Sequence, residues 1–435
     1  MLTKIFFTNC FLLAMMATPS LIPASDTPNI LLIIGDDISY RDYGFMGAKH
    51  VDTPNLDQLA REGMTYTRGY VPTSLCRASL MSIITGLYPH QHGVVGNDPP
   101  KGEDRAKMLW AIRTHETIPK FLTTKGYASF QSGKWWEGAP SEGGFTSGMT
   151  HGDATKGGRH GDAGLKIGRD SLEPIESAVA KSQQEKKPFF VWYAPMLPHT
   201  PHDPPADLLA KYQPKTDSIH VAKYWANVER FDRTVSELRE ILKRHGVFEN
   251  TLIVYMHDNG WIQDPNAGKF AARSKRSPYE GGVRTPLILH WPGKIKPVRD
   301  EQTLVSSLDV APTIAGASGA AISAALPGMN LLAAPTEQRE RRTAVFGESF
   351  SHDVASLNQP EKGLEHRWCI EGNWKLIYDA NTRRCELYDL ANDPEEQSNV
   401  ASSNPASSER LLKRLDVWWD GKHVVTKNND PFQKK

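Results

Sequence analysis

The stretch that decides the fold is Asn29-Ile30-Leu31-Leu32-Ile33-Ile34-Gly35-Asp36-Asp37. Its residues 30–34 are all apolar, and isoleucine is frequent among them. A short continuous run of this kind is typical of a parallel strand that is buried on both of its faces. Two carboxylates follow at once, so we expect Asp36 and Asp37 to lie at the carboxyl end of a buried strand.

Further segments along the chain alternate between strand and helix patterns. Strands are predicted at residues 64–71, 127–131, 188–193, 251–256 and 286–291. Helices are predicted at residues 53–63, 77–86, 118–124 and 221–245. This alternation predicts an α/β fold with a mostly parallel central sheet flanked by helices.

The pattern changes near residue 340. Shorter strand-like segments follow, and a final helix is predicted at residues 408–419. The strands lie at residues 343–348, 367–371, 374–378 and 385–388. Gly-Asn and Asp-Ala-Asn turns between them indicate an antiparallel sheet. Because 435 residues exceed one average core, we expect a catalytic domain over residues 26–340 and a smaller C-terminal subdomain of antiparallel sheet plus helix over 341–435.

The first 25 residues are predicted to be a secretory signal peptide. Lys4 precedes the apolar residues 11–17, and Ala24 is a plausible cleavage site. The alternative is a membrane anchor, but the apolar run is short and interrupted. We therefore expect an exported, periplasmic or secreted protein without a stable membrane anchor. A net charge of +1 offers no general surface for nucleic acid, so no nucleic-acid partner is expected.

Three cysteines remain after that leader: Cys76, Cys369 and Cys385. Cys369 and Cys385 could pair in an oxidising compartment, since both lie in strand-like segments close in sequence. Cys76 is then unpaired, and such a cysteine in an exported protein is reactive, modified or simply buried. It precedes an amphipathic helix, where free amide donors and the helix dipole favour negative charge. Cys76 is therefore a candidate nucleophile.

Polar side chains follow several of the predicted strands. In open α/β sheets the functional site lies beyond the carboxyl ends of the strands. The residues in that position are Asp36, Asp37, Lys134, His199, Asp258 and Asn259. A lone Asp36-Asp37 pair is better explained as a helix cap or turn, but Asp258-Asn259 on a second strand makes an all-oxygen metal site the better interpretation. Such ligands suit Ca²⁺, with Mg²⁺ as the alternative.

Positive charge accompanies these carboxylates. Lys134, Lys275 and His199 add cationic groups near the predicted metal, and Arg284 is a further candidate. Each lysine alone would be an ordinary solvated side chain. Beside a nucleophile at a helix N-terminus, however, such groups form a site for the transfer of an anionic group. The cations neutralise the anion, the nucleophile attacks its central atom and the histidine protonates the leaving oxygen.

Six motifs within residues 28–400 resemble type I sulfatases of the alkaline-phosphatase-like superfamily, in the order found in that family. They are Asn29–Asp37, Cys76–Gly86, Gly133-Lys134-Trp135, Pro198-His199, Asp258-Asn259-Gly260 and Lys275–Pro286. Residues 374–377 and 386–395 also resemble the C-terminal subdomain of those enzymes. The resemblance implies an alkaline-phosphatase-like fold and the hydrolysis of sulfuric esters.

The resemblance also implies a role for each matched residue. Cys76 would be converted to formylglycine by a formylglycine-generating maturation enzyme, and the hydrate of this aldehyde would supply the nucleophilic hydroxyl. Lys134 and Lys275 would bind the sulfate oxygens, and His199 would be the general acid at the leaving alcohol. The implied Ca²⁺ ligands, together with residue 76, are Asp36, Asp37, Asp258 and Asn259.

Two positions depart from the family pattern. The family signature is Cys-x-Pro-x-Arg, or Ala at its third position, whereas this chain has Cys76-Arg77-Ala78-Ser79-Leu80. The family usually has Gly-Lys-Trp-His, whereas here Trp136 takes the last position and keeps an N–H donor for the substrate. Arg77 could replace the lost guanidinium, but adjacent helix positions point about 100° apart. Alternatively, Arg159 and His160 would bind substrate from the polar loop 157–162, which is explained equally well as a surface turn.

The sequence therefore predicts a sulfuric-ester hydrolase for a sulfated small molecule or glycan, with a carbohydrate favoured. Eleven tryptophans allow sugar stacking, although core packing explains a tryptophan more often. The first alternative is a phosphate- or phosphonate-ester hydrolase that uses unmodified Cys76 or a metal-bound hydroxide. The second is a non-catalytic protein that binds sulfated glycan, and His199 argues against it.

Overall fold

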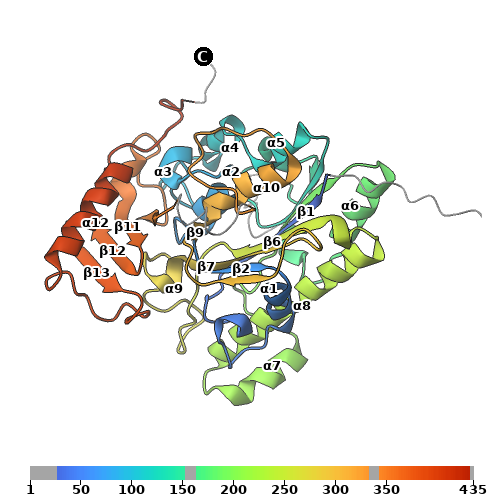
Figure 1. Ribbon diagram of the computed structural model, residues 1–435, viewed down its shortest axis with the longest axis horizontal. Coiled ribbons are helices and arrows are strands. Elements are labelled where there is room, and N and C mark those ends of the chain that lie inside the picture. Colours follow the sequence, from blue (N-terminus) through green and yellow to red (C-terminus); the bar gives the residue numbers. More distant parts are fainter. Residues whose placement is uncertain (1–26, 152–162, 333–341, 432–435) are drawn as a thin grey trace, which may run out of the picture.

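The computed structural model describes residues 27–151, 163–332 and 342–431, which form one large and one small sheet (Figure 1). The predicted leader, residues 1–25, lies outside this part of the chain, as do Arg159 and His160. Within the described ranges, no helix combines the length and apolar character needed to cross a membrane.

The large sheet contains nine strands. They are β1 (Asn29–Gly35), β2 (Met64–Tyr70), β3 (Ala128–Gly133), β4 (Ser147–Gly148), β5 (Phe189–Ala194), β6 (Thr251–His257), β7 (Arg284–His290), β8 (Val298–Asp300) and β9 (Val305–Ser306). Their order is β4-β3-β5-β1-β6-β7-β2-β8, and β9 pairs with β2. The strands run parallel except β7, which is antiparallel to both of its neighbours. The prediction of a mostly parallel central sheet is confirmed.

Strand β1 lies in the middle of this sheet, with all seven of its residues buried. Its side chains alternate between two apolar cores because successive strand residues point to opposite faces. Ile30 and Leu32 belong to one core, whereas Leu31 and Ile33 belong to the other. This arrangement explains why the run lacks polar residues: neither face of β1 meets solvent.

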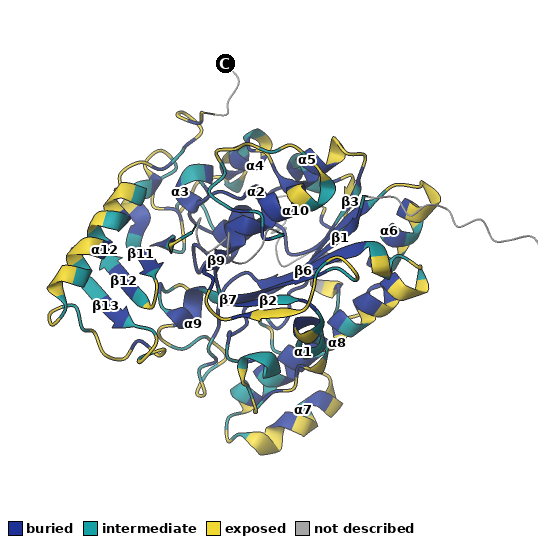
Figure 2. Cartoon of the chain, viewed as in Figure 1, coloured by how far each residue is buried: buried dark blue, intermediate teal, exposed yellow. Residues whose placement is uncertain are grey.

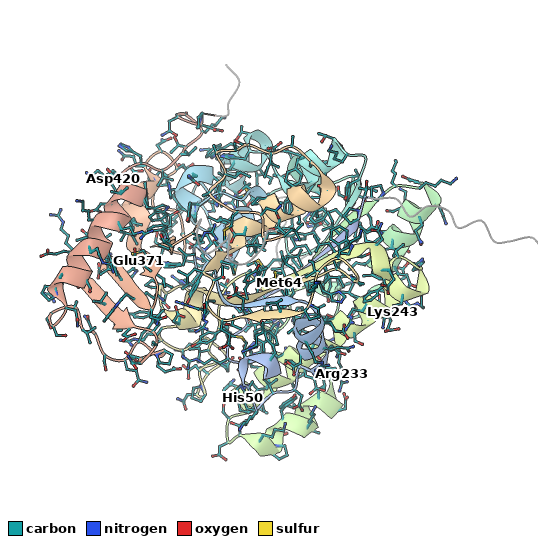
Figure 3. All side chains as sticks on the ribbon, viewed as in Figure 1. His50, Met64, Arg233, Lys243, Glu371 and Asp420 are labelled. Carbon is teal, nitrogen blue, oxygen red and sulfur yellow. The ribbon has the colours of Figure 1, made fainter. Side chains whose placement is uncertain are left out.

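Helices cover both faces of the sheet (Figures 1 and 2). The helices on the face of Ile30 are α2 (Cys76–Thr85), α5 (Ile118–Thr123) and α10 (Val310–Ser318). Those on the face of Leu31 are α1 (Pro54–Glu62), α6 (Glu173–Gln184) and α8 (Ile219–Arg244). The shorter helices are α3 (Pro89–His92), α4 (Trp110–Thr114), α7 (Ala206–Tyr212) and α9 (Glu280–Val283). Helix α8 turns Phe231 and Leu238 toward the sheet, whereas Arg233 and Lys243 lie on its outer side (Figure 3).

The small sheet is antiparallel, as predicted for the C-terminal part of the chain. Its strands, in spatial order, are β10 (Ala344–Phe350), β11 (Leu364–Glu371), β12 (Trp374–Asp379) and β13 (Cys385–Asp389). Helix α12 (Pro405–Trp418) packs Leu411 and Leu415 on its outer face. Glu371, labelled in Figure 3, lies at the end of β11. It binds two arginines of α12, Arg410 and Arg414.

The inner face of the small sheet joins the core of the large one. Trp368, Ile370 and Ile377 belong to the same apolar core as Ile30 and Leu32. The C-terminal sheet is therefore buried on both faces, by α12 on one side and by the large sheet with its helices on the other.

The pairing considered for Cys369 and Cys385 is wrong, because both residues are free cysteines. Cys369 lies on β11 and Cys385 on β13, with β12 between them. Neighbouring strands are about 4.8 Å apart, so residues two strands apart exceed the roughly 7 Å that a disulfide spans between Cα atoms. Cys369 instead packs beneath α12, with Sγ 3.7 Å from the carbonyl oxygen of Leu411.

Candidate active site

The carboxyl ends of β1 and β6 bring the predicted metal ligands into contact. The Asp37 N–H donates to Asp258 Oδ1 at 3.2 Å, and Asn259 Nδ2 donates to Asp37 Oδ1 at 2.6 Å. Asp37 has a left-handed backbone, with φ 64°, which aspartate tolerates better than most residues. Together with Asp36, these side chains form a buried group of oxygens.

Two lysines bind this group. Lys134, which follows β3, places Nζ 2.5 Å from Asp36 Oδ1 and 3.2 Å from Asp258 Oδ2. Lys275, in the loop after β6, places Nζ 2.7 Å from Asp37 Oδ2. Burial acts to lower the pKa of each lysine, but the neighbouring carboxylates outweigh it and raise both pKa values above the ordinary range. Both lysines therefore carry a positive charge.

His199 follows β5 and faces the same carboxylates. Its Nε2 is 3.5 Å from Asp37 Oδ2, and its Nδ1 is 2.7 Å from the carbonyl oxygen of Thr200. A carbonyl oxygen only accepts, so Nδ1 carries the hydrogen of the neutral ring. Burial lowers the pKa of His199 to about 3, although Asp37 opposes the shift. The imidazole is therefore neutral before substrate binds.

Cys76 is the first residue of α2, and its sulfur belongs to the same cluster. One ligand atom each from Asp36, Asp37, Cys76 and His199 lie within 4.8 Å of one another. Burial raises the pKa of the Cys76 thiol to about 11, against the opposing charge of the two lysines. In the first turn of α2, Ser79 Oγ donates to the carbonyl oxygen of Asp258, which fixes the helix to the end of β6.

Two oxygens of the cluster are buried without a hydrogen-bond partner: Asp36 Oδ2 and Asn259 Oδ1. Buried polar atoms are nearly always bonded, because leaving one unpaired is costly. Oxygen atoms of carboxylate and amide groups are the ligands that hard divalent cations prefer. The residues present therefore fit a Ca²⁺ or Mg²⁺ ion.

The charges of the cluster favour the same conclusion. Three carboxylates meet two ammonium groups, so the formal charge of the cluster is −1 when all three carboxylates are ionised and His199 is neutral. Burial raises the pKa of Asp258 to about 7 despite the adjacent Lys134, and burial also raises the pKa of Asp36. A divalent cation would reverse this balance and make the site attractive to an anion.

Comparison with known proteins identifies the family. The family model described as Sulfatase matches residues 28–320, which is more than half of the chain and includes the whole cluster. The chain belongs to the sulfatase family. A second model, described as N-sulphoglucosamine sulphohydrolase, C-terminal, matches residues 268–417. The predicted enzyme class, a sulfuric-ester hydrolase, is confirmed.

Individual relatives extend the match over nearly the whole chain. Arylsulfatase A of Homo sapiens is 26% identical, over 89% of this chain and 86% of its own length. The ulvan-active sulfatase of Formosa agariphila is 26% identical, over 93% of this chain and 82% of its own length. Among solved structures, the crystal structure of Ps i-CgsB has a TM-score of 0.75 at 26% identity, covering 91% of this chain and 94% of that one. The predicted alkaline-phosphatase-like fold of the sulfatases is thus confirmed.

The two departures from the sulfatase pattern are both buried, in the same apolar core as Cys76. Leu80 is 6% exposed and packs in the apolar core, so hydrocarbon fills the place where the family has arginine. Trp136 is also 6% exposed, and Lys134 Nζ lies 5.0 Å from the centre of its ring, a cation–π contact. The indole Nε1 of Trp136 is buried without a hydrogen-bond partner. Trp136 therefore contacts the predicted sulfate-binding lysine through its ring.

Arg77 is committed to another partner. Its Nε and Nη2 donate to the two carboxylate oxygens of Glu137 at 2.5 and 2.8 Å, and Nη2 also donates to the carbonyl oxygen of Met108 at 3.0 Å. Both side chains of the pair are buried. Arg77 thus joins the start of α2 to the segment after Lys134 and does not supply the guanidinium that the signature lacks.

Arg284, the further cationic candidate, lies outside the cluster. Its Nη2 donates to the carbonyl oxygen of Thr67 at 3.0 Å, and its Nη1 is 3.5 Å from Glu280.

Two residues near the site were not assigned a role from the sequence. One is His202: burial lowers its pKa to about 4, although the charge of Asp37 opposes the shift. The repeated Pro-His in residues 198–202 was the available sign of His202. Glu137 gave no sign, because its partner Arg77 is 60 residues away.

Proposed function

We propose that the chain hydrolyses sulfate esters of carbohydrates, using a formylglycine made from Cys76 and a bound Ca²⁺. One observation carries the proposal: Lys134, Lys275 and His199 converge on buried carboxylates at the N-terminus of α2, where Cys76 begins the helix. Transfer of an anionic group needs a nucleophile, fixed positive charge and a proton donor in one place.

Asp36, Asp37, Asp258 and Asn259 would hold the Ca²⁺ beside residue 76. The orphaned oxygens of Asp36 and Asn259 support this assignment. A set of protein oxygens favours Ca²⁺ over Mg²⁺, which retains several of its own waters. When bound, the ion would polarise a sulfate oxygen as a Lewis acid.

Lys134 and Lys275 would bind the sulfate oxygens and stabilise the charge that develops on them during transfer. The nearby Trp136 ring would help to hold Lys134 through the cation–π contact. His199 would donate a proton from Nε2 to the leaving oxygen, because the bond from Nδ1 to Thr200 fixes the ring. The negative charge of a bound sulfate ester would raise the pKa of His199 and so favour its protonated form.

The state of residue 76 separates the proposal from its first alternative. Burial raises the pKa of the Cys76 thiol to about 11, so that without a bound cation the thiol is protonated at neutral pH and is a poor nucleophile. The hydrate of a formylglycine would supply a hydroxyl group instead. This difference favours the modified residue over a phosphate- or phosphonate-ester hydrolase that attacks with unmodified Cys76.

A carbohydrate is proposed as the substrate because one relative over most of the chain is named an ulvan-active sulfatase. Arg159 and His160 remain proposed substrate contacts, and export by the N-terminal leader would place the enzyme in the periplasm or outside the cell.

The deciding experiment measures the state of residue 76 and the ester that is hydrolysed. A peptide containing residue 76 is isolated from protein made in the native host, and conversion lowers its mass by about 18 Da relative to the thiol. Release of sulfate and of phosphate from matched monoesters is then measured for the wild type and Cys76→Ala. We expect the converted mass, and sulfate release that is abolished in Cys76→Ala.

Two other outcomes identify the alternatives. An unmodified thiol, with release of phosphate but not of sulfate by the wild type, would establish the phosphatase. Phosphate release lost in Cys76→Ala would then identify Cys76 as its nucleophile, and release that survives would identify a metal-bound hydroxide. Binding of a sulfated glycan without turnover of either ester would establish the glycan-binding protein.

A further inference from the structure

A buried lysine of the C-terminal sheet lies between two carboxylates. Lys375, on β12, is fully buried, and its Nζ is 3.0 Å from Glu280 Oε1 and 2.8 Å from Glu396 Oε1. Glu280 begins α9, in the large part of the molecule, whereas Glu396 lies in the loop after β13. Each of these carboxylates is 1% exposed. Removing one partner from such a group would leave a buried charge without compensation.

The segment 273–283, called the lysine loop below, leads from this ion group to the active site. Its Lys275 binds Asp37 at 2.7 Å. The N–H of Arg276 donates to the carbonyl oxygen of Ser74 at 2.9 Å, two residues before the predicted nucleophile. The lysine loop is therefore attached on one side to the residues that surround position 76.

The other side of the lysine loop is attached to the C-terminal sheet. The Glu280 N–H donates to Glu396 Oε2 at 2.6 Å, and Tyr279 donates to Glu386 Oε2 at 2.7 Å. Arg273 donates to the carbonyl oxygen of Glu396. These contacts come from the strand β13 and the loop after it, in addition to the ion pairs of Lys375.

The backbone of this region is held in a costly conformation. Three residues that are not glycine are left-handed: Arg273 with φ 55°, Arg276 with φ 66° and Glu396 with φ 56°. Such residues persist where the surroundings hold them, mostly at functional sites. A Cβ atom on Gly281 would lie 2.4 Å from the Arg273 carbonyl oxygen, so the loop packs tightly on itself. A shift at Glu280 would therefore be transmitted to Lys275.

We propose that Lys375 is a positioning residue of the reaction: by binding Glu280 and Glu396 it fixes the lysine loop, and with it Lys275, against the active-site carboxylates. The inference rests on the proposed function, in which Lys275 binds sulfate. It gives the C-terminal sheet a part in catalysis, although the active-site cluster is drawn from the large sheet and its loops.

The test uses the full chain carrying both Lys375→Met and Glu396→Gln. This pair of substitutions removes the two ion pairs of Lys375 and one charge of each sign, so that Glu280 retains Arg284 as a partner at 3.5 Å. We expect faster amide hydrogen exchange in residues 273–283 and a kcat/KM for a sulfate monoester that is about 100-fold lower, because small misplacements of a binding group are costly. Glu396→Gln alone, expected to change both in the same direction but less, serves if the double variant does not fold.

Arg342→Met is the matched control. Arg342 also pairs with a buried carboxylate, with Nη2 2.6 Å from Asp309 Oδ1, but neither residue belongs to the lysine loop. We expect the control to lower the unfolding temperature while exchange in residues 273–283 and kcat/KM stay at wild-type values.

Unchanged exchange in the lysine loop of the double variant would overturn the proposal, and so would an equal loss of kcat/KM in the control. Amide hydrogen exchange is measured without substrate turnover. It therefore tests whether Lys375 holds the lysine loop even if the chain does not hydrolyse sulfate esters. Failure of the proposed function would instead appear as a wild type that releases no sulfate.

Discussion

At the scale of single residues, Lys134 forms ion pairs with two buried carboxylates, which follow two different strands. Lys134→Ala removes a positive charge from a cluster that already has more carboxylates than lysines. We expect kcat/KM for a sulfate monoester to fall about 100- to 1000-fold, as for loss of a group that stabilises charge in the transition state. Steady-state kinetics and metal analysis of dialysed protein check this, with the Ca²⁺ content expected to persist.

Lys211→Ala controls for the loss of a lysine that binds two carboxylates elsewhere. Lys211 pairs with Asp52 and Glu229 near the surface, where such pairs contribute little. Its kinetics should match the wild type. If kcat/KM of Lys134→Ala equals that of the wild type, Lys134 has no role in the reaction.

Substitutions at Arg276 test whether the backbone of the lysine loop is strained. A left-handed conformation costs an L-residue about 1–2 kcal/mol, and a glycine at this position would remove that cost. Glycine also makes the unfolded chain more flexible, which lowers stability by about 0.4–1 kcal/mol and offsets part of the gain. We therefore expect Arg276→Gly to raise the free energy of unfolding by about 0.5–1 kcal/mol, measured by urea denaturation. Arg276→Ala loses the same charge but keeps a Cβ atom, so it should show no gain. Equal effects of both substitutions would mean that the backbone there is unstrained.

The position of a residue relative to a strand decided whether its place could be predicted. Asp36, Lys134 and Asp258 follow apolar runs, and parallel strands end at one edge of a sheet, so their contacts could be expected. Lys275 follows no strand, so the strand pattern gave its positive charge but not its place, and the family motif supplied its role. Glu137 could not be found, because a buried ion pair across 60 residues leaves no local pattern.

At the scale of elements, the N-terminus of α1 is capped by a different helix. The side chain of the cap residue Thr53 accepts no bond from the backbone N–H groups of the helix, whereas Asp232 of α8 accepts from the N–H groups of Asn55 and Leu56 at 3.2 and 2.7 Å. Asp232→Ala would leave these donors unpaired inside the protein. We expect a loss of about 1–3 kcal/mol in the free energy of unfolding by urea.

Asp232→Asn retains an acceptor and should lose less than Asp232→Ala. Glu237→Ala, on the same helix, serves as the control for removing a carboxylate from α8. Equal stability of Asp232→Ala and the wild type would show that α1 does not depend on this cap.

The order of the C-terminal strands predicts the behaviour of the cysteines. Since β12 separates Cys369 from Cys385, dithiothreitol should leave the unfolding temperature unchanged. In denaturant, the mature protein should show two titratable thiols per chain if residue 76 is formylglycine. A third thiol would indicate unmodified Cys76, and a fall in the unfolding temperature on reduction would contradict the strand arrangement.

At the scale of the whole molecule, continuous apolar runs predicted the parallel sheet because its strands are buried on both faces. The reversed direction of β7 was not predictable, since its apolar run resembles that of its parallel neighbours. The sequence likewise could not predict that the C-terminal sheet is buried on both faces. Trp368 and Ile377 point into the core of the large sheet, and a short strand does not reveal what its second face meets.

Buried histidines make the stability of the whole molecule sensitive to acid. His92 is fully buried: its Nε2 lies 3.0 Å from Ser82 Oγ, and its Nδ1 accepts from the Val94 N–H at 3.1 Å. Burial holds the pKa of His92 well below its ordinary value, with repulsion from His115 and His90 adding to the effect. Below about pH 6.5 the unfolded chain therefore binds a proton at His92 that the folded protein excludes. The stability that this site contributes is present above that pH and is lost as the pH falls.

Comparing the wild type with His92→Gln isolates this effect from that of other titrating groups. Glutamine cannot be protonated, so any cost of the substitution itself is the same at both pH values. Between pH 7.5 and 5.5 we expect the free energy of unfolding by urea to fall by about 1.4 kcal/mol more in the wild type than in His92→Gln. An equal fall in both proteins would mean that the folded protein accepts a proton at His92 as readily as the unfolded chain.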